Sequence, residues 1–306
     1  MARVSVIVPA HNSACYIEQA LSSVEQQTFA DWDVVVADDA SSDDTADIAA
    51  RFAPRVACVR SDTNVGPAAA RNLALAAATG ELVAFLDADD YWMPEFLERH
   101  IAAFDTAQAS GLRPGIVTGD VRVLGPDGFA ATTYRSEHPL DGPPSLARLL
   151  ERNPIFISSL APRAAIDEVG PMDHEIWGAE DYDLWLRIVE AGYSVVVLPD
   201  VLAVYRRHDS ALTSSQARAA GSQALAYARA LERGRLGSGE RRIARRQLRY
   251  SRAVEAVALA AEPGPHRGRA RWRLVAKLPL VAFVAVTNPR LWPLWLHGIR
   301  SRITGR

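Results

Sequence analysis

The sequence is poor in cysteine and in long apolar runs. Cys15 and Cys58 are the only cysteines among 306 residues, and two isolated thiols provide neither the ligand spacing of a zinc site nor a disulfide framework. The longest candidate for a membrane span, Leu278 to Val286, contains Pro279 and falls short of the roughly 18 to 20 apolar residues that a spanning helix needs. Strand-like sequence starts at Val4, which leaves no room for a signal peptide. These absences predict a cytoplasmic protein.

Acidic residues are scarce in the last part of the chain. Residues 1–232 carry 17 basic and 33 acidic side chains, a net charge of −16, whereas residues 233–306 carry 17 basic and 3 acidic ones, a net charge of +14. Residues 263–306 contain nine arginines or lysines, no acid and three tryptophans, a mixture that suits peripheral contact with the anionic inner face of a membrane. The alternatives are a helical pair packed on the acidic part of the chain and a basic surface that binds another protein.

Strand and helix patterns alternate through the first 110 residues. Such alternation predicts βαβ crossovers. The expected fold class is therefore α/β, with a mainly parallel sheet flanked by helices. The expected strands are Val4 to Val8, Trp32 to Ala37, Val56 to Val59 and Leu82 to Leu86, and the expected helices are Tyr16 to Gln26, Thr45 to Phe52, Ala68 to Ala78 and Pro94 to about Ala107.

The pattern changes further along the chain. Residues 110–145 are rich in Gly, Pro and Thr and predict strands and loops that add to one side of the sheet. A helix is expected again from Tyr182 to Ala191, and the composition shifts to Ala and Arg after Ser215. The expected units are a first domain at 1–215 and a basic helical extension at 216–306, with helices near 216–233 and 240–261.

Three carboxylates end the apolar run E-L-V-A-F-L-D-A-D-D. This run, Glu81 to Asp90, predicts a buried strand that places Asp87, Ala88, Asp89 and Asp90 at the carboxyl edge of the sheet, where open α/β folds bind their ligands. Crowded carboxylates repel one another unless a cation lies among them, and Mg²⁺ or Mn²⁺ combines carboxylate ligands with substrate phosphates. The segment predicts a metal and diphosphate site, and the alternative is a solvated turn.

Polar residues also follow the first two strands. The first strand, V-S-V-I-V-P-A-H-N, ends in Pro9, Ala10, His11 and Asn12, which either turn their backbone toward a ligand or simply end the strand. The second strand ends in D-D-A-S-S-D-D-T. There Asp39 can accept hydrogen bonds from a base or a ribose, while Ser42 or Asp43 can cap the next helix.

The third strand is followed by N-V-G-P-A-A-A-R-N, which begins at Asn64. Gly66 and Pro67 suit a tight turn and a helix start. Arg71 is the only cation between Arg60 and Arg99. It is either a partner in a surface salt bridge or an arginine that supports the acidic site or a nucleotide phosphate.

Taken in chain order and at their observed spacings, the segments that follow the first three strands and the segment that ends in Asp87 to Asp90 resemble glycosyltransferase family 2. The resemblance runs from residue 4 to about residue 213. The resemblance implies a GT-A fold, a nucleotide-diphosphate sugar donor, a divalent metal ion held by the Asp-x-Asp motif, and inversion at the anomeric carbon. It assigns the metal to Asp87 and Asp89. It assigns the nucleotide-sugar to Pro9, Ala10, His11, Asn12, Asp39, Asn64, Arg71, Asp87, Ala88 and Asp89.

Two downstream segments extend the resemblance. G-A-E-D-Y-D-L-W-L-R, Gly178 to Arg187, is similar to the family's Glu-Asp motif, which implies that Asp181 is the general base and that Glu180 helps to orient or bind the acceptor. Without the resemblance, these acids would only complement a helix N-terminus. V-Y-R-R-H-D-S-A-L-T resembles the family's closing segment, in which His208 would approach the metal or the diphosphate.

The sequence thus predicts a Mg²⁺- or Mn²⁺-dependent inverting glycosyltransferase. The donor is expected to be a UDP-sugar, with thymidine and guanosine donors left open, and the acceptor a glycan, a lipid-linked sugar or a small molecule in cell-surface polysaccharide or glycolipid synthesis. No nucleic-acid partner is expected. Processive members of the family usually carry Gln-x-x-Arg-Trp, which this chain lacks, so single addition is favoured. The alternatives are a nucleotidyltransferase, which should have a Gly-rich phosphate loop, and a non-catalytic nucleotide-sugar-binding protein.

Overall fold

A computed structural model describes residues 2–137, 139, 144–208 and 215–261. The chain divides into two compact units. The first comprises Met1–Glu175 and Glu180–Asp209, and the second comprises Ile176–Ala179 and Ser210–Arg306.

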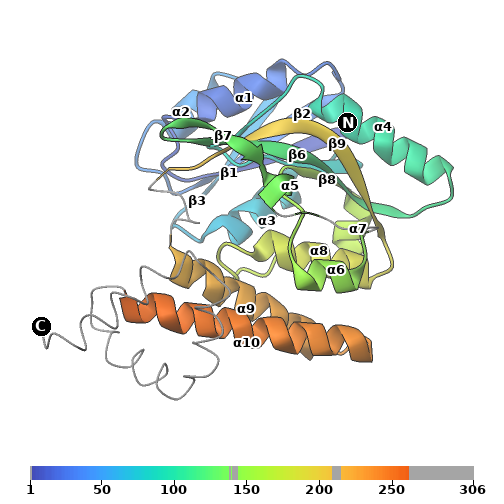
Figure 1. Cartoon of the computed structure of the whole chain (residues 1–306). Helices are drawn as coiled ribbons and strands as arrows, with labels where there is room; N and C mark the ends of the chain where they lie inside the picture. The colour runs from blue at the N-terminus through green and yellow to red at the C-terminus, as the bar shows by residue number, and fades with distance from the viewer. Residues whose placement is uncertain (1, 138, 140–143, 209–214, 262–306) are drawn as a thin grey trace, which may run out of the picture. The chain divides into compact units, whose positions relative to one another are not determined.

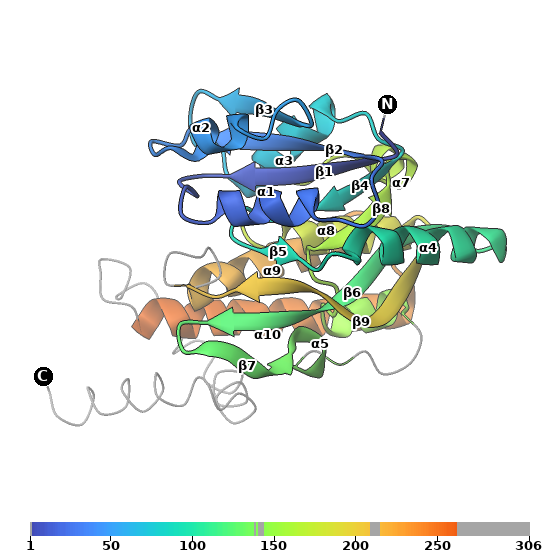
Figure 2. The ribbon, with the colours of Figure 1, turned by 90° about the horizontal axis from the view of Figure 1, so that it is seen from above.

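Within the described residues, nine strands form one sheet in the first unit. Its first half is parallel and consists of β1 (Val4–Ala10), β2 (Trp32–Asp39), β3 (Val56–Ser61) and β4 (Leu82–Phe85). Figure 2 shows these strands side by side in the order β3, β2, β1, β4. Apolar and mostly β-branched residues fill β1 and β2, whose residues are almost all buried, as expected for strands that helices cover on both faces.

The second half of the sheet reverses direction at one strand. β8 (Ser159–Pro162) lies antiparallel between β4 and β6 (Pro114–Gly125), and β9 (Ser194–Arg206) then runs parallel to β6. β5 (Tyr91–Trp92) and β7 (Gly128–Thr133) pair antiparallel with β9 and β6. Six of the nine described strands therefore point the same way, which confirms the mainly parallel α/β sheet. The strands expected within residues 110–145 are β6 and β7.

Helices cover both faces of the sheet. Figure 1 shows α1 (Ile17–Glu25) and α4 (Phe96–Ala109) on one face and α3 (Pro67–Ala77) and α8 (Glu180–Glu190) on the other. The buried side chains of α1 are Ile17, Ala20, Leu21, Ser23 and Val24, the spacing of a helix with one apolar face. The remaining described helices of this unit are α2 (Thr45–Ala50), α5 (Tyr134–Glu137), α6 (Leu146–Glu151) and α7 (Arg163–Val169).

The register of the parallel strands brings their carboxyl ends to one edge. Ala10 of β1 pairs with Asp38 of β2, and Ile7 pairs with Phe85 of β4. The polar segments that follow these three strands therefore start next to one another. This edge carries the candidate site.

The second unit contains α9 (Gln216–Glu232) and α10 (Ser238–Ala261), which lie side by side as a helical hairpin (Figure 1). Ser215 caps α9, because its side chain accepts a hydrogen bond from the backbone N–H of Arg218 at 3.3 Å. Small buried residues, including Ala220 and Ala224 of α9 and Ala244 of α10, allow the two helices to approach closely. Among the described residues, no helix combines the length and the hydropathy that crossing a membrane requires.

Candidate active site

The acidic cluster follows β4 directly. Asp87, Asp89 and Asp90 offer carboxylate oxygens that all lie within 4.8 Å of one another. A turn brings them together, since the backbone N–H of Asp90 donates to the carbonyl of Asp87 at 3.0 Å. Asp90 is buried, whereas Asp87 and Asp89 are half-buried. Ala88, between them in the sequence, is buried.

Burial and mutual repulsion both disfavour ionisation of these carboxyl groups. Burial raises the pKa of Asp89, and the charge of Asp87 raises it further. Burial and the charges of Asp89 and Asp87 raise the pKa of Asp90 well above its usual range. The Oδ2 atom of Asp90 has no hydrogen-bond partner among the described residues. Converging hard oxygen ligands, one of them unsatisfied, fit a divalent cation such as Mg²⁺ or Mn²⁺.

The end of β9 holds this cluster in place. The backbone N–H of Arg206 donates to Asp90 Oδ1 at 2.8 Å, and its guanidinium Nε donates to the carbonyl of Asp89 at 2.9 Å. Two residues later, His208 Nε2 lies 2.8 Å from Asp89 Oδ2, and the ring centroids of His208 and Tyr16 are 5.0 Å apart. The structure therefore places His208 at the cluster, and its role toward a metal or diphosphate stays a prediction. Sequence reasoning missed Arg206, although it stands in the same V-Y-R-R-H segment.

A buried arginine joins the acidic cluster to α8. The guanidinium of Arg71 pairs with Asp87 through one terminal nitrogen and with Glu180 through the other. Only 5% of the Arg71 side chain and 5% of the Glu180 side chain are exposed, so this is not a surface salt bridge. Burial alone would lower the pKa of Arg71, but the charges of Asp87 and Glu180 outweigh it and raise that pKa.

The neighbouring Asp181 has a different environment. Its Oδ1 accepts a hydrogen bond from the backbone N–H of Tyr182 at 2.7 Å, and the residue is half-buried. Burial, and next the charge of Glu180, raise the pKa of Asp181 to about 7. Asp183 differs again, because it pairs with Arg187 at 2.8 Å within α8. Of the three acids in this turn, Asp181 is the one poised to take up a proton near neutral pH.

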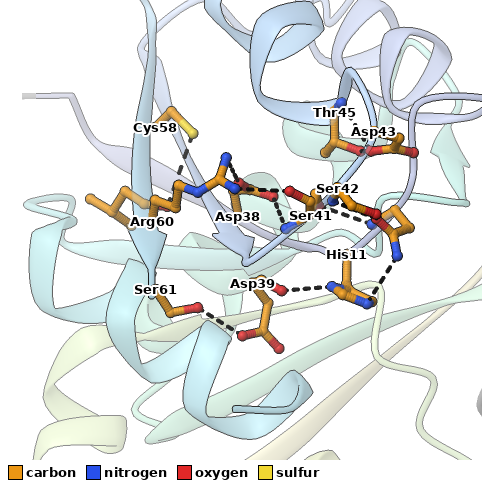
Figure 3. Close-up of polar contacts among 12 residues, drawn as sticks. His11, Asp38, Asp39, Ser41, Ser42, Asp43, Thr45, Cys58, Arg60 and Ser61 are labelled. Atoms are coloured by element: carbon orange, nitrogen blue, oxygen red, sulfur yellow. Dashed lines mark hydrogen bonds and ion pairs between the residues drawn. The ribbon is translucent and has the colours of Figure 1, made fainter. Parts of the chain in front are cut away.

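Asp39 organises the turn that opens α3. Its Oδ1 accepts hydrogen bonds from Ser61 Oγ and from the backbone N–H of Val65, and its Oδ2 accepts one from the N–H of Gly66, each at 2.8 Å. Figure 3 shows the Asp39 carboxylate directed toward Ser61. Gly66 has a φ of 87°, which favours glycine at this position. Asn64 lies exposed just before this turn.

Two carboxylate oxygens offer about four acceptor positions. The turn takes three of those on Asp39, two on Oδ1 and one on Oδ2. One position on Oδ2 is left for a ligand.

The segment after β1 is tied to the end of β2. His11 Nδ1 lies 2.6 Å from the carbonyl of Asp39, and His11 Nε2 lies 3.1 Å from Asn12 Nδ2. Because the carbonyl can only accept, Nδ1 carries the proton and Nε2 accepts from the amide. Asn12, at a φ of 49°, accepts in turn from the backbone N–H of Ser42 at 2.8 Å. Pro9 and Ala10 complete β1 beside this loop.

Asp43, and not Ser42, supports the start of α2. The Asp43 carboxylate accepts from the backbone N–H of Thr45 and from that of Ala14, each at 3.1 Å. Beside it, the buried Asp38 pairs with Arg60 at 2.8 Å, and Arg60 also donates to the carbonyl of Ser41 (Figure 3). Together these contacts hold the loop after β2 in a fixed conformation.

Comparison with known proteins identifies this arrangement. Residues 5–131 match the family model described as glycosyl transferase family 2. Residues 5–131 form a glycosyltransferase family 2 domain. The family suggested by the four sequence motifs is confirmed, and so is the assignment of the chain to the glycosyltransferases.

Three relatives illustrate the range of similarity. The putative teichuronic acid biosynthesis glycosyltransferase TuaG of Bacillus subtilis is 29% identical over 75% of this chain and 88% of its own length. The Escherichia coli protein named UDP-Glc:alpha-D-GlcNAc-diphosphoundecaprenol beta-1,3-glucosyltransferase WfgD is 41% identical over 32% of this chain and 40% of its own length. Similarity to the glycosyltransferase alr2836 of Nostoc spans 35% of that protein. For these last two relatives, the match spans less than half of their length.

Solved structures share the fold. Residues 1–349 of Staphylococcus aureus TarS, in complex with UDP-GlcNAc, have a TM-score of 0.63 at 21% identity, over 92% of this chain and 79% of that TarS chain. The mannosyltransferase PcManGT of Pyrobaculum calidifontis, in complex with GDP-Man and Mn²⁺, has a TM-score of 0.65 at 22% identity, over 100% of this chain and 88% of PcManGT. These likenesses confirm the expected GT-A fold. The roles of single residues stay predictions.

Proposed function

We propose that this protein is a metal-dependent inverting glycosyltransferase that moves a sugar from a nucleotide-diphosphate donor to an acceptor hydroxyl. One observation carries the proposal. The buried guanidinium of Arg71 binds Asp87 of the acidic cluster on one side and Glu180, next to Asp181, on the other. The carboxylates that could bind a cation therefore belong to the same site as Asp181, the carboxylate that could accept a proton.

The acids have separate roles in this mechanism. Asp87 and Asp89, with Asp90 and His208 beside them, would hold the divalent ion, which stabilises the negative charge on the departing nucleoside diphosphate. Asp181 takes the proton of the acceptor hydroxyl while that oxygen attacks the anomeric carbon and the bond to the diphosphate breaks. Because attack comes from the face opposite the leaving group, the configuration inverts. Glu180 is already paired with Arg71 and serves to position Asp181.

The hydrogen bonds of Asp39 favour a uridine donor. The one acceptor position that the turn leaves on its Oδ2 matches the single N–H on the pairing edge of uracil or thymine, whereas guanine presents two parallel N–H groups that would need both oxygens. TarS and PcManGT are named in complex with UDP-GlcNAc and GDP-Man. We therefore propose a UDP-sugar for this chain, with a TDP-sugar as the second candidate.

The acceptor proposal follows the relatives. TuaG is named for teichuronic acid biosynthesis and WfgD for a diphosphoundecaprenol-linked substrate. A lipid-linked or polymeric cell-surface glycan is the acceptor that we propose, at the inner face of the membrane. The predicted membrane contact of residues 263–306 lies outside the described residues.

A nucleoside diphosphate release screen tests the proposed function. The protein is incubated with Mg²⁺ or Mn²⁺, a set of UDP-, TDP- and GDP-sugars, and extracts that contain lipid-linked acceptors. We expect release above background with one UDP-sugar or TDP-sugar. Release of pyrophosphate in a parallel incubation with nucleoside triphosphates and sugar phosphates would instead support a nucleotidyltransferase. Binding of a nucleotide-sugar without turnover would support a non-catalytic protein.

Replacing Asp89 by asparagine should remove the contribution of metal to nucleotide binding. The substitution keeps the shape of the side chain but takes one charged ligand from the cluster. Calorimetry should show that Mn²⁺ strengthens UDP binding to the parent protein and not to Asp89→Asn. Asp127→Asn, a change at an exposed carboxylate, is the control and should behave as the parent. Equal enhancement in Asp89→Asn and the parent would contradict the assignment.

The raised pKa of Asp181 predicts the pH dependence of transfer. Asp181 accepts a proton only when it is ionised, and its pKa is about 7. At saturating Mn²⁺, kcat should therefore rise with pH up to about 7 and level off above it. UDP affinity should not follow the same curve, because Asp181 does not bind the nucleotide in this mechanism. A kcat that stays flat from pH 5 to 8 would show that another group takes the proton.

A further inference from the structure

The first three quarters of α10 carry six arginines on one side. They are Arg241, Arg242, Arg245, Arg246, Arg249 and Arg252, and all six are exposed. At 3.6 residues per turn they cover an arc of about 140° and a length of about 16 Å along the helix. No acidic residue stands between Arg241 and Arg252 in the sequence. We call these six residues the α10 arginine face.

Buried residues on the opposite side of the same helix segment show which way the α10 arginine face points. Ala244 and Ser251 are buried, and α10 packs along α9. The arginines therefore belong to the outer surface of the helical hairpin. A surface with this density of one charge repels itself unless anions compensate it, so it is suited to a partner with many negative charges spread over a plane or a groove.

We propose that the α10 arginine face docks on an anionic phospholipid surface. The composition of the adjoining segment favours a membrane over a protein or a nucleic acid. The chain continues beyond Ala261 into residues 263–306, whose sequence has nine further arginines or lysines, no acid, and Trp272, Trp292 and Trp295. Basic residues next to tryptophans are typical of the boundary between lipid headgroups and acyl chains. The α10 arginine face has the same excess of basic residues, on a helix whose exposed side the structure defines.

Charge-reversal variants of the full chain test this proposal. Arg242, Arg245 and Arg249 are changed together to glutamate, and separately together to lysine. Arg241 is kept because its guanidinium bonds the carbonyl of Leu236. A control triple, Arg51→Glu, Arg122→Glu and Arg152→Glu, changes the net charge equally at exposed positions of the first unit. Circular dichroism verifies that every variant keeps its helices.

Co-sedimentation with vesicles is the measurement. The parent should bind phosphatidylcholine vesicles that contain phosphatidylglycerol, should not bind pure phosphatidylcholine, and should lose binding as salt is raised. Each arginine near an anionic leaflet strengthens binding about fivefold, and glutamate adds repulsion to the loss of attraction, so the glutamate triple should bind at least about 100-fold more weakly. The lysine triple and the control triple should bind like the parent.

Several results would overturn the proposal. The first is that the parent binds neither lipid, or binds both equally. The second is that the glutamate triple binds like the parent. The third is that the lysine triple loses binding like the glutamate triple, because loss on a change to lysine indicates bidentate recognition of a specific partner. Tighter binding to duplex DNA than to the anionic vesicles would assign the face to nucleic acid. Sugar transfer to a small acceptor does not depend on this face, so the proposed function stands or falls separately.

Discussion

Asp181→Asn should lower kcat by roughly 10² to 10⁴, the usual contribution of a general base, while UDP affinity stays within a few-fold of the parent. Asparagine keeps the size of the side chain and its hydrogen bond from Tyr182 but cannot take a proton. Only the step that removes the acceptor proton should therefore suffer. The measurement is steady-state transfer together with calorimetric UDP binding.

The control for this variant is Asp167→Asn, a change at an exposed carboxylate on α7, which should leave kcat unaltered. Residual transfer above about a tenth of the parental rate would be too large for loss of the base. In that case the base lies elsewhere. The neighbouring acids offer poor replacements, because Glu180 is held by Arg71 and Asp183 by Arg187.

Arg71→Met should destabilise the first unit by about 3–5 kcal/mol, the usual effect of removing one partner from a buried ion pair. Without the arginine, the buried Glu180 loses its ion pair with Arg71, and Asp87 loses the cation that offsets the other acids of the cluster. Urea unfolding of the metal-free protein measures the loss. Arg71→Lys should lie between the parent and Arg71→Met, because one ammonium cannot bridge two carboxylates as the guanidinium does.

A double variant separates the ion pair from simple packing. Adding Glu180→Gln to Arg71→Met removes the buried charge that has lost its ion pair with Arg71, so part of the lost stability should return. If the double variant is as unstable as the sum of the two single variants, Arg71 acts by filling space. A loss below about 1 kcal/mol in Arg71→Met would contradict a buried ion pair altogether.

Most of the parallel half of the sheet can be predicted from sequence. Short runs such as V-S-V-I-V and L-V-A-F-L admit few readings other than buried strands, and the helices between them carry a regular apolar face. The reversal of direction at β8 could not be predicted in this way. β8 joins β4 to β6 from another part of the chain. Its sequence S-L-A-P has only two apolar residues between a serine and a proline, so, unlike L-V-A-F-L, it has no apolar run that distinguishes it from a loop.

The candidate site was predictable only in part, because its motifs are local but the contacts between them are not. Asp87, Asp89 and Asp181 stand in dense local motifs, and the structure places the first two in one cluster and the third beside Glu180. The contacts that join these motifs are distant in sequence: Arg71 and Glu180 are 109 residues apart, and Asp90 and Arg206 are 116 apart. No local pattern indicates which carboxylate a given arginine will meet, because the fold alone brings the two together.

The anomeric configuration of the product tests the account most directly. The donor found in the release screen, with an α-linked diphosphate, is incubated with its acceptor and Mn²⁺, and proton NMR follows the anomeric signal of the transferred sugar as it forms. We expect a β-linked product, together with one equivalent of nucleoside diphosphate and no product in Asp181→Asn. An α-linked product would contradict inversion, and with it the role of Asp181 as the base opposite the leaving group.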